Sequence, residues 1–112
     1  MRLALLLLAG LLAGCAYVEA TTVPYVGVPK YDPVDPASVR VLETEPKERH
    51  DRLGEVVLYA SADPAPTPAD IEKRFREEAA KWGANAVYVV RDLLPRGEDR
   101  QIVGIAIRYR SP

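Results

Sequence analysis

The stretch "TPADIEKRFREEAAKWGANAVYVV", Thr67 to Val90, decides the fold, because it predicts a helix that leads through a tight turn into an apolar strand. Thr67 is a good helix N-cap, Pro68 suits the first helical position, and Asp70 can complete a capping box. Gly83 can adopt the left-handed geometry that closes a helix. The apolar side chains between these signals fall on one stripe: Ile71, Phe75, Ala79 and Trp82. The segment therefore predicts a helix with one face buried against a sheet.

Four segments around this helix carry strand patterns, with turn-forming residues between them. Residues 55–61 are too apolar on both faces for an exposed strand, so we expect them inside a sheet. In residues 101–110 bulky side chains alternate with small or charged ones, and we expect the bulky face, with Val103 and Ile107, to meet the core. The expected strands are residues 38–45, 55–61, 85–94 and 101–110.

The predicted element order is β-β-α-β-β. A strand–helix–strand crossover is right-handed and makes its two strands parallel, whereas the last two strands form a hairpin. The expected fold class is therefore α+β, a two-layer sandwich in which one helix packs on a mixed sheet. The charged segment from Pro46 to Gly54 is expected to be a loop between the first two strands.

The amino-terminal residues have the pattern of a signal peptide. Met1 and Arg2 give a short basic start, and residues 3–12 form an apolar run. Ten residues reach about 15 Å as a helix, roughly half of a bilayer core, so the run is short for a membrane span. A signal anchor that is never cleaved is the alternative, because the apolar character continues to Val18 before Glu19 stops it.

Leu12, Ala13, Gly14 and Cys15 match every position of the lipobox, and the segment resembles that of bacterial lipoprotein precursors. The resemblance implies cleavage before Cys15, a thioether-linked lipid on its sulfur and acylation, for example by palmitate, of the new amino terminus. The alternative is a buried cysteine in an apolar helix. Position 16 is alanine rather than the aspartate that retains many lipoproteins in the inner membrane. We therefore expect a lipid-anchored envelope protein, in the outer membrane facing the periplasm.

Residues 15–37 are expected to be the lipidated amino terminus and a proline-rich tether, between a signal peptide (residues 1–14) and the α+β domain (residues 38–112). Each proline lacks an amide donor and biases its predecessor to extended geometry, which excludes a helix. Two interpretations stay open. The segment is a spacer with a reach of roughly 60 Å, or it is an extended arm that lies on the domain. The prolines are Pro24, Pro29, Pro33 and Pro36, and the apolar residues that favour docking are Tyr25, Val26, Val28 and Tyr31.

The segment "EEAAKWGANAVYVV", with "LGEVVLYA" before it and "GIAIRY" after it, resembles two groups of small bacterial domains. They are the RcsF-like envelope lipoproteins and the YbjQ-like domains, in which a Gly-Ala-Asn/Asp-Ala turn joins a helix to an apolar strand. The resemblance covers roughly residues 38 to 110 and implies a similar fold. RcsF is a surface-stress sensor whose domain is stabilised by disulfide bonds. This chain has no cysteine beyond Cys15, so its domain cannot form such a bond. YbjQ-like domains have been suggested to bind heavy metals, but no His/Cys cluster here supports that.

Residues that carry chemistry are few. His50 is the only histidine, and Glu48 and Asp51 lie beside it in a segment expected to be a solvated loop. Asp32 and Asp35 are candidate calcium ligands in principle, but aspartates beside prolines more often form turns. Two aromatic residues are expected in the core rather than as ligand stackers: Trp82 and Tyr88.

The charge balance also limits function. Fifteen basic and sixteen acidic residues give a formal net charge of −1, and no basic block indicates nucleic-acid binding. We therefore expect no enzyme and no cofactor, but a non-enzymatic interaction or sensing module. It is held on the membrane by its lipid anchor, with an envelope protein as a possible partner. The alternative is an accessory lipoprotein that binds a ligand or a metal.

Overall fold

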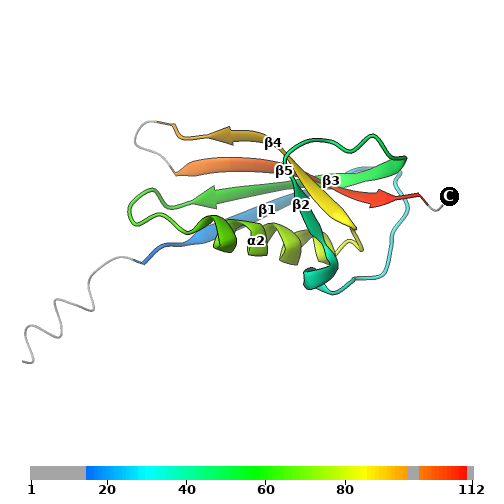
Figure 1. Ribbon diagram of the computed structural model, residues 1–112, viewed down its shortest axis with the longest axis horizontal. Coiled ribbons are helices and arrows are strands. Elements are labelled where there is room, and N and C mark those ends of the chain that lie inside the picture. Colours follow the sequence, from blue (N-terminus) through cyan, green and yellow to red (C-terminus); the bar gives the residue numbers. More distant parts are fainter. Residues whose placement is uncertain (1–14, 96–98, 111–112) are drawn as a thin grey trace, which may run out of the picture.

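The computed structural model describes residues 15–95 and 99–110. Within these residues five strands form one mixed sheet in the order β1-β3-β5-β4-β2 (Figure 1). One α-helix, α2, packs against this sheet, and a 3-10 turn, η1, precedes β2. The elements are β1 (Val18–Pro24), η1 (Pro36–Ser38), β2 (Arg40–Leu42), β3 (His50–Ala60), α2 (Pro68–Ala80), β4 (Ala86–Leu93) and β5 (Arg100–Tyr109).

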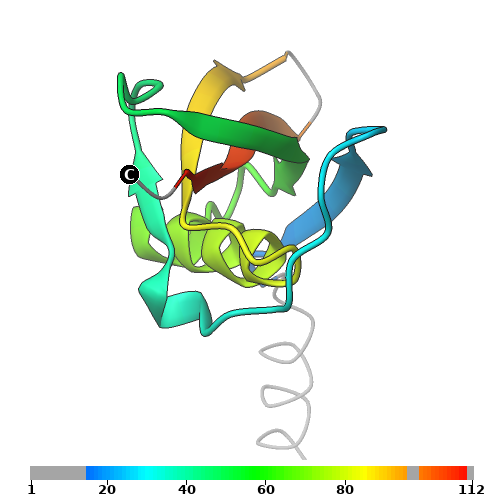
Figure 2. The same ribbon diagram turned by 90° about the vertical axis from the view of Figure 1, so that its right-hand side faces the viewer.

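The expected α+β sandwich is confirmed: α2 lies along one face of the sheet (Figure 2). β5 is the central strand and runs antiparallel to both of its neighbours, β3 and β4. The two strands that flank the helix in sequence, β3 and β4, are therefore parallel to each other with β5 between them. β4 and β5 form the expected hairpin, and β2 pairs in parallel with β4.

The helix signals in the sequence act as expected. The Asp70 N–H donates to the Thr67 hydroxyl (3.2 Å), and the Thr67 N–H donates to the Asp70 carboxylate (3.3 Å), so the capping box is complete. Gly83 has a φ of 72°, in the left-handed region. Phe75 is only 1% exposed at the centre of the helix–sheet interface. Trp82 lies beyond the last helical residue and is only partly buried.

The segment expected to be a tether contributes a strand. Val18 to Pro24 pair with β3 along their whole length, from Val18 opposite Ala60 to Pro24 opposite Gly54. Of the two interpretations left open, the structure supports the arm that lies on the domain. The sheet therefore includes residues that precede the boundary expected at residue 38. A proline is tolerated here because β1 is an edge strand and Pro24 is its last residue.

The second strand is longer than expected and includes much of the predicted loop. β3 begins at His50, and its register with β5 shifts between Arg52 and Gly54. Gly54, at this irregularity, pairs with Pro24 of β1, and a Cβ added to it would lie 2.6 Å from the Val23 carbonyl oxygen. His50 therefore belongs to a strand, and the expectation of a solvated loop histidine is wrong.

The bulky face of β5 is buried at Val103 and Ile107, as expected, but it does not face α2. A Cβ on Gly104 would lie 2.8 Å from the Phe75 ring, so the helix packs on the face that holds Gly104 and Ala106. The Phe75 ring leaves no space for a side chain at Gly104, whereas Ile102 and Ala106 of the same face are buried in the core with it. The opposite face of the sheet, which we call the open face, has a second and smaller core cluster of Ala86, Tyr88 and Ile107.

Candidate functional site

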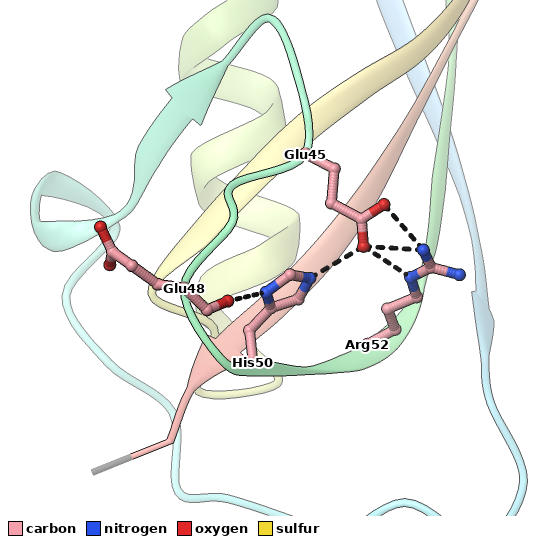
Figure 3. Close-up of polar contacts among 4 residues, drawn as sticks. All are labelled: Glu45, Glu48, His50 and Arg52. Atoms are coloured by element: carbon pink, nitrogen blue, oxygen red, sulfur yellow. Dashed lines mark hydrogen bonds and ion pairs between the residues drawn. The ribbon is translucent and has the colours of Figure 1, made fainter. Parts of the chain in front are cut away.

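A polar cluster lies on the open face, where the chain returns from β2 to β3. Figure 3 shows the segment after β2 passing through Glu45 and Glu48 before it reaches His50 at the start of β3. His50 and Arg52 are two residues apart on β3 and pair with Tyr109 and Ile107, so both side chains point to the open face. Glu45 meets them from the returning segment. We call Glu45, His50 and Arg52 the Glu45 cluster.

The Glu45 carboxylate contacts both Arg52 and His50. The Arg52 guanidinium donates to Oε1 and Oε2, each at 2.7 Å, and its Nε donates to Oε1 at 3.1 Å. His50 Nε2 lies 2.9 Å from Oε1, and His50 Nδ1 faces the backbone carbonyl of Glu48. The His50 side chain is only 10% exposed, whereas Arg52 is half exposed. The cluster therefore ties the returning segment to β3.

The charges in this cluster stabilise one another. Hydrogen bonds from Arg52, and then from His50, hold the pKa of the Glu45 carboxyl below its ordinary value. The same contact raises the pKa of Arg52. Both ring nitrogens of His50 face an oxygen acceptor, the Glu45 carboxylate on one side and the Glu48 carbonyl on the other. The cluster therefore stabilises the contact between β3 and the segment that returns from β2.

Two tyrosines border the cluster. The ring of Tyr109 contacts His50 edge-on, with ring centroids 6.4 Å apart. Tyr88 is 3% exposed, and its hydroxyl has no hydrogen-bond partner among the described residues. Burial is the main cause that raises the pKa of this hydroxyl. Burying a hydroxyl without a hydrogen-bond partner costs free energy, so the Tyr88 oxygen lowers the stability of the open face.

The two acidic residues beside His50 in the sequence do not place their carboxylates against it. Glu48 contributes its backbone carbonyl rather than its carboxylate, and Asp51 points to the opposite face, where it pairs with Arg110 at 2.7 Å. Glu45 and Arg52 were missed. Strand alternation would have placed Arg52 beside His50 if β3 had been predicted to begin there. Among residues 15–95 and 99–110, no hydroxyl or thiol hydrogen-bonds to His50.

The remaining candidates from the sequence are dispersed. Cys15 is exposed and lies three residues before β1, while Leu12, Ala13 and Gly14 fall outside the described residues. Asp35 accepts a hydrogen bond from the Ala37 N–H (2.9 Å) and caps η1, the turn-forming role that the sequence favoured. In the described part of the chain, no three His, Cys, Asp or Glu side chains are placed to hold a metal ion.

At least two cavities lie elsewhere on the surface of the described residues. The larger, of about 460 Å³, lies between the first half of α2 and the β2 and β4 side of the sheet. The second, of about 370 Å³, lies under the arm that follows β1 and is bordered by Tyr25, Tyr31 and Trp82. The carboxylates at the larger cavity do not converge. Asp92 is held by two hydrogen bonds from Arg100 (2.6 and 2.8 Å), and Glu72 pairs with Arg76.

Comparisons with known proteins inform the fold alone. No protein-family model and no curated protein matches the chain. A solved structure, the Francisella virulence factor FvfA, is similar with a TM-score of 0.59 and 20% sequence identity. The match covers 80% of this chain and 97% of FvfA. None of the helices in the described residues is both long enough and apolar enough to cross a bilayer. The lipobox and the resemblance to RcsF-like domains stay predictions from the sequence.

Proposed function

We propose that this chain is a bacterial envelope lipoprotein, anchored through Cys15, whose α+β domain is a non-enzymatic interaction or sensing module. The observation that carries the proposal is the position of Cys15, which is exposed and lies three residues before β1. Three extended residues reach about 10 Å. A lipid on Cys15 would therefore keep the sheet close to the bilayer surface, without the roughly 60 Å of slack that a free tether allows.

Contact with another molecule is the favoured activity because apolar side chains remain exposed on the domain. Three of them, Val90, Leu93 and Leu94, lie close together in sequence at the end of β4. Exposed apolar groups that gather in one place are typical of an interaction surface. A domain fixed close to a membrane would present this surface to partners in the same compartment, which we propose to be the periplasm.

The anchor is tested by substituting Cys15 in the full chain expressed in a Gram-negative host. With radiolabelled palmitate, we expect the wild type to take up label and to fractionate with the outer membrane. Cys15→Ala should lose the label and accumulate as the longer precursor. Ala16→Asp is the matched control, since it should keep the label while moving the protein to the inner membrane. Undiminished labelling of Cys15→Ala would refute the anchor.

The second candidate function, a ligand-binding accessory lipoprotein, is favoured by the cavity of about 370 Å³ under the arm. Apolar pockets with a few polar groups are the usual form of small-molecule sites. Trp82 borders this cavity and is the only tryptophan in the chain, so its fluorescence reports on the site directly. A compound that changes this fluorescence and raises the melting temperature, with saturation, would support the second function.

A further inference from the structure

Most of β4 has a free edge. β2 pairs only with Ala86 to Tyr88, and beyond this point β4 pairs with β5 alone, with a register shift between Val89 and Arg91. No other strand of the described chain lies on the outer side of residues 89–93. The backbone groups that point away from β5 here have no partner in the described part of the sheet, and such an edge can accept another strand.

The edge is free because β2 ends early. The sequence favours a strand from residue 38 to 45, but β2 stops at Leu42 and the chain turns away toward His50 (Figure 3). The Glu45 cluster holds the chain in this course, since Glu45 is bound to His50 and Arg52 on β3. These contacts of Glu45 are thus the reason why the outer edge of β4 is left uncovered.

A groove accompanies this free edge. The cavity of about 460 Å³ lies between it and the first half of α2, with Ile71, Phe75, Val89 and Ile102 among its lining residues. Val90 and Leu93 of β4 and Leu94 just after it are 51%, 47% and 68% exposed beside this edge, although they do not line the cavity. An open sheet edge beside an apolar groove and a helix is the geometry that accepts an extended peptide, because the edge bonds its backbone and the groove takes alternate side chains.

The charge of the groove indicates which peptide would fit. Glu43, Glu72 and Asp92 line it, together with a single cation among the described residues, Arg100. Arg100 is neutralised by Asp92 through two hydrogen bonds. Glu72 also pairs with Arg76 at 3.7 Å, but this contact is exposed and therefore weak, and Glu43 forms no ion pair among the described residues. The rim thus stays acidic, which favours a basic segment and opposes a second copy of this chain, since pairing two β4 edges would bring two acidic rims together.

We propose that residues 89–93 of β4 and the adjoining groove bind an extended segment of a partner protein as an additional strand. The segment has apolar side chains at alternate positions and carries lysine or arginine opposite Glu43 and Glu72. Pairing with five residues of β4 spans about 16 Å, so the segment needs roughly five to seven residues. This inference rests on the interaction-module part of the proposed function and is independent of the lipid anchor.

Selection from a random dodecapeptide library displayed on phage tests the site, with the full chain carrying Cys15→Ala as bait. We expect enriched peptides in which β-branched or aromatic residues alternate and at least one residue is basic. A synthetic peptide of the enriched sequence, added to ¹⁵N-labelled protein, should shift the amide signals of residues 89–93 and of Ile71 and Phe75. Slower hydrogen exchange at residues 89–93 would show that the edge amides have acquired hydrogen-bond partners.

Charge variants on α2 provide the matched control. Glu72→Lys changes the groove rim, whereas Glu77→Lys changes a residue of the same helix that does not line the groove. We expect Glu72→Lys to weaken binding of the enriched peptide roughly three- to tenfold at low salt, and Glu77→Lys to change it less than about twofold. Failure to enrich any peptide, signals that shift on β1 instead, or equal effects of the two variants would each overturn the proposal. Absence of palmitate labelling would overturn the anchor and leave these outcomes unaffected.

Discussion

Substitution of Gly104 by alanine tests the packing of α2 on the central strand. The new methyl group would lie 2.6 Å from a methyl of Val87 and 2.8 Å from the Phe75 ring, both closer than real Cβ contacts. Overpacking of this kind costs about 1–3 kcal/mol. Loss of unfolded-state freedom on changing glycine to alanine offsets about 0.4–1 kcal/mol of this. We expect a net loss of roughly 1–2 kcal/mol in the free energy of unfolding.

Thermal unfolding followed by circular dichroism measures this loss as a decrease of roughly 5–15 °C in Tm. The double variant Gly104→Ala with Phe75→Leu should lose less than the sum of the single variants, because the smaller side chain removes one clash. Gly27→Ala is the contrast, since Gly27 has a φ of 83° but open space around it. Its penalty should be unaffected by Phe75→Leu. An unchanged or higher Tm for Gly104→Ala would show that the helix does not pack on this face.

Three further substitutions test the cap and the open face. Thr67→Ala removes the acceptor that caps α2 and should lower the free energy of unfolding by about 1 kcal/mol in urea titrations, so a change below about 0.3 kcal/mol would contradict the cap. Tyr88→Phe removes a buried hydroxyl without a partner and should leave stability equal or up to about 1 kcal/mol higher, whereas a loss of that size would reveal a hidden partner. Glu45→Gln should lower Tm at pH 7, because it weakens the contacts with Arg52 and His50. Since the folded state lowers the pKa of Glu45 below its ordinary 4.5, the stabilisation is present above that value and is lost as the pH falls through the folded-state pKa. The Tm difference between wild type and Glu45→Gln should therefore shrink as the pH is lowered from about 6 to about 3, and a difference that grows would contradict the assignment.

The helix was predictable because its signals are local. A cap, a first-turn proline and a closing glycine act within a few residues, so Thr67, Pro68 and Gly83 have the same roles in sequence and structure. β1 was harder to predict because it depends on a distant partner. In the sequence, Pro24 is typical of a linker. It is compatible with a strand only because β1 lies at the edge of the sheet and ends at this residue.

The candidate site was less predictable than the fold because it depends on register. The segment around His50 is highly charged, which is typical of a solvated loop, and only the pairing of His50 with Tyr109 reveals a strand. Which carboxylate reaches the imidazole depends on the path of the chain from β2. That path brings Glu45, five residues away, rather than the neighbouring Glu48 or Asp51. Local sequence contains no information of this kind.

The Glu45 cluster and the free edge of β4 are linked through the path of the chain after Leu42. A strand that begins at Arg40 can continue along β4 only if the chain stays beside it after Leu42. Glu45 instead makes its hydrogen bonds on β3, which is separated from β4 by β5 in the sheet order, so the chain must leave the edge. The charge-assisted hydrogen bonds of Glu45 replace the backbone hydrogen bonds that a longer β2 would make. The hydrogen bonds of the Glu45 cluster, on one face of the sheet, therefore leave the groove beside α2 open on the other face.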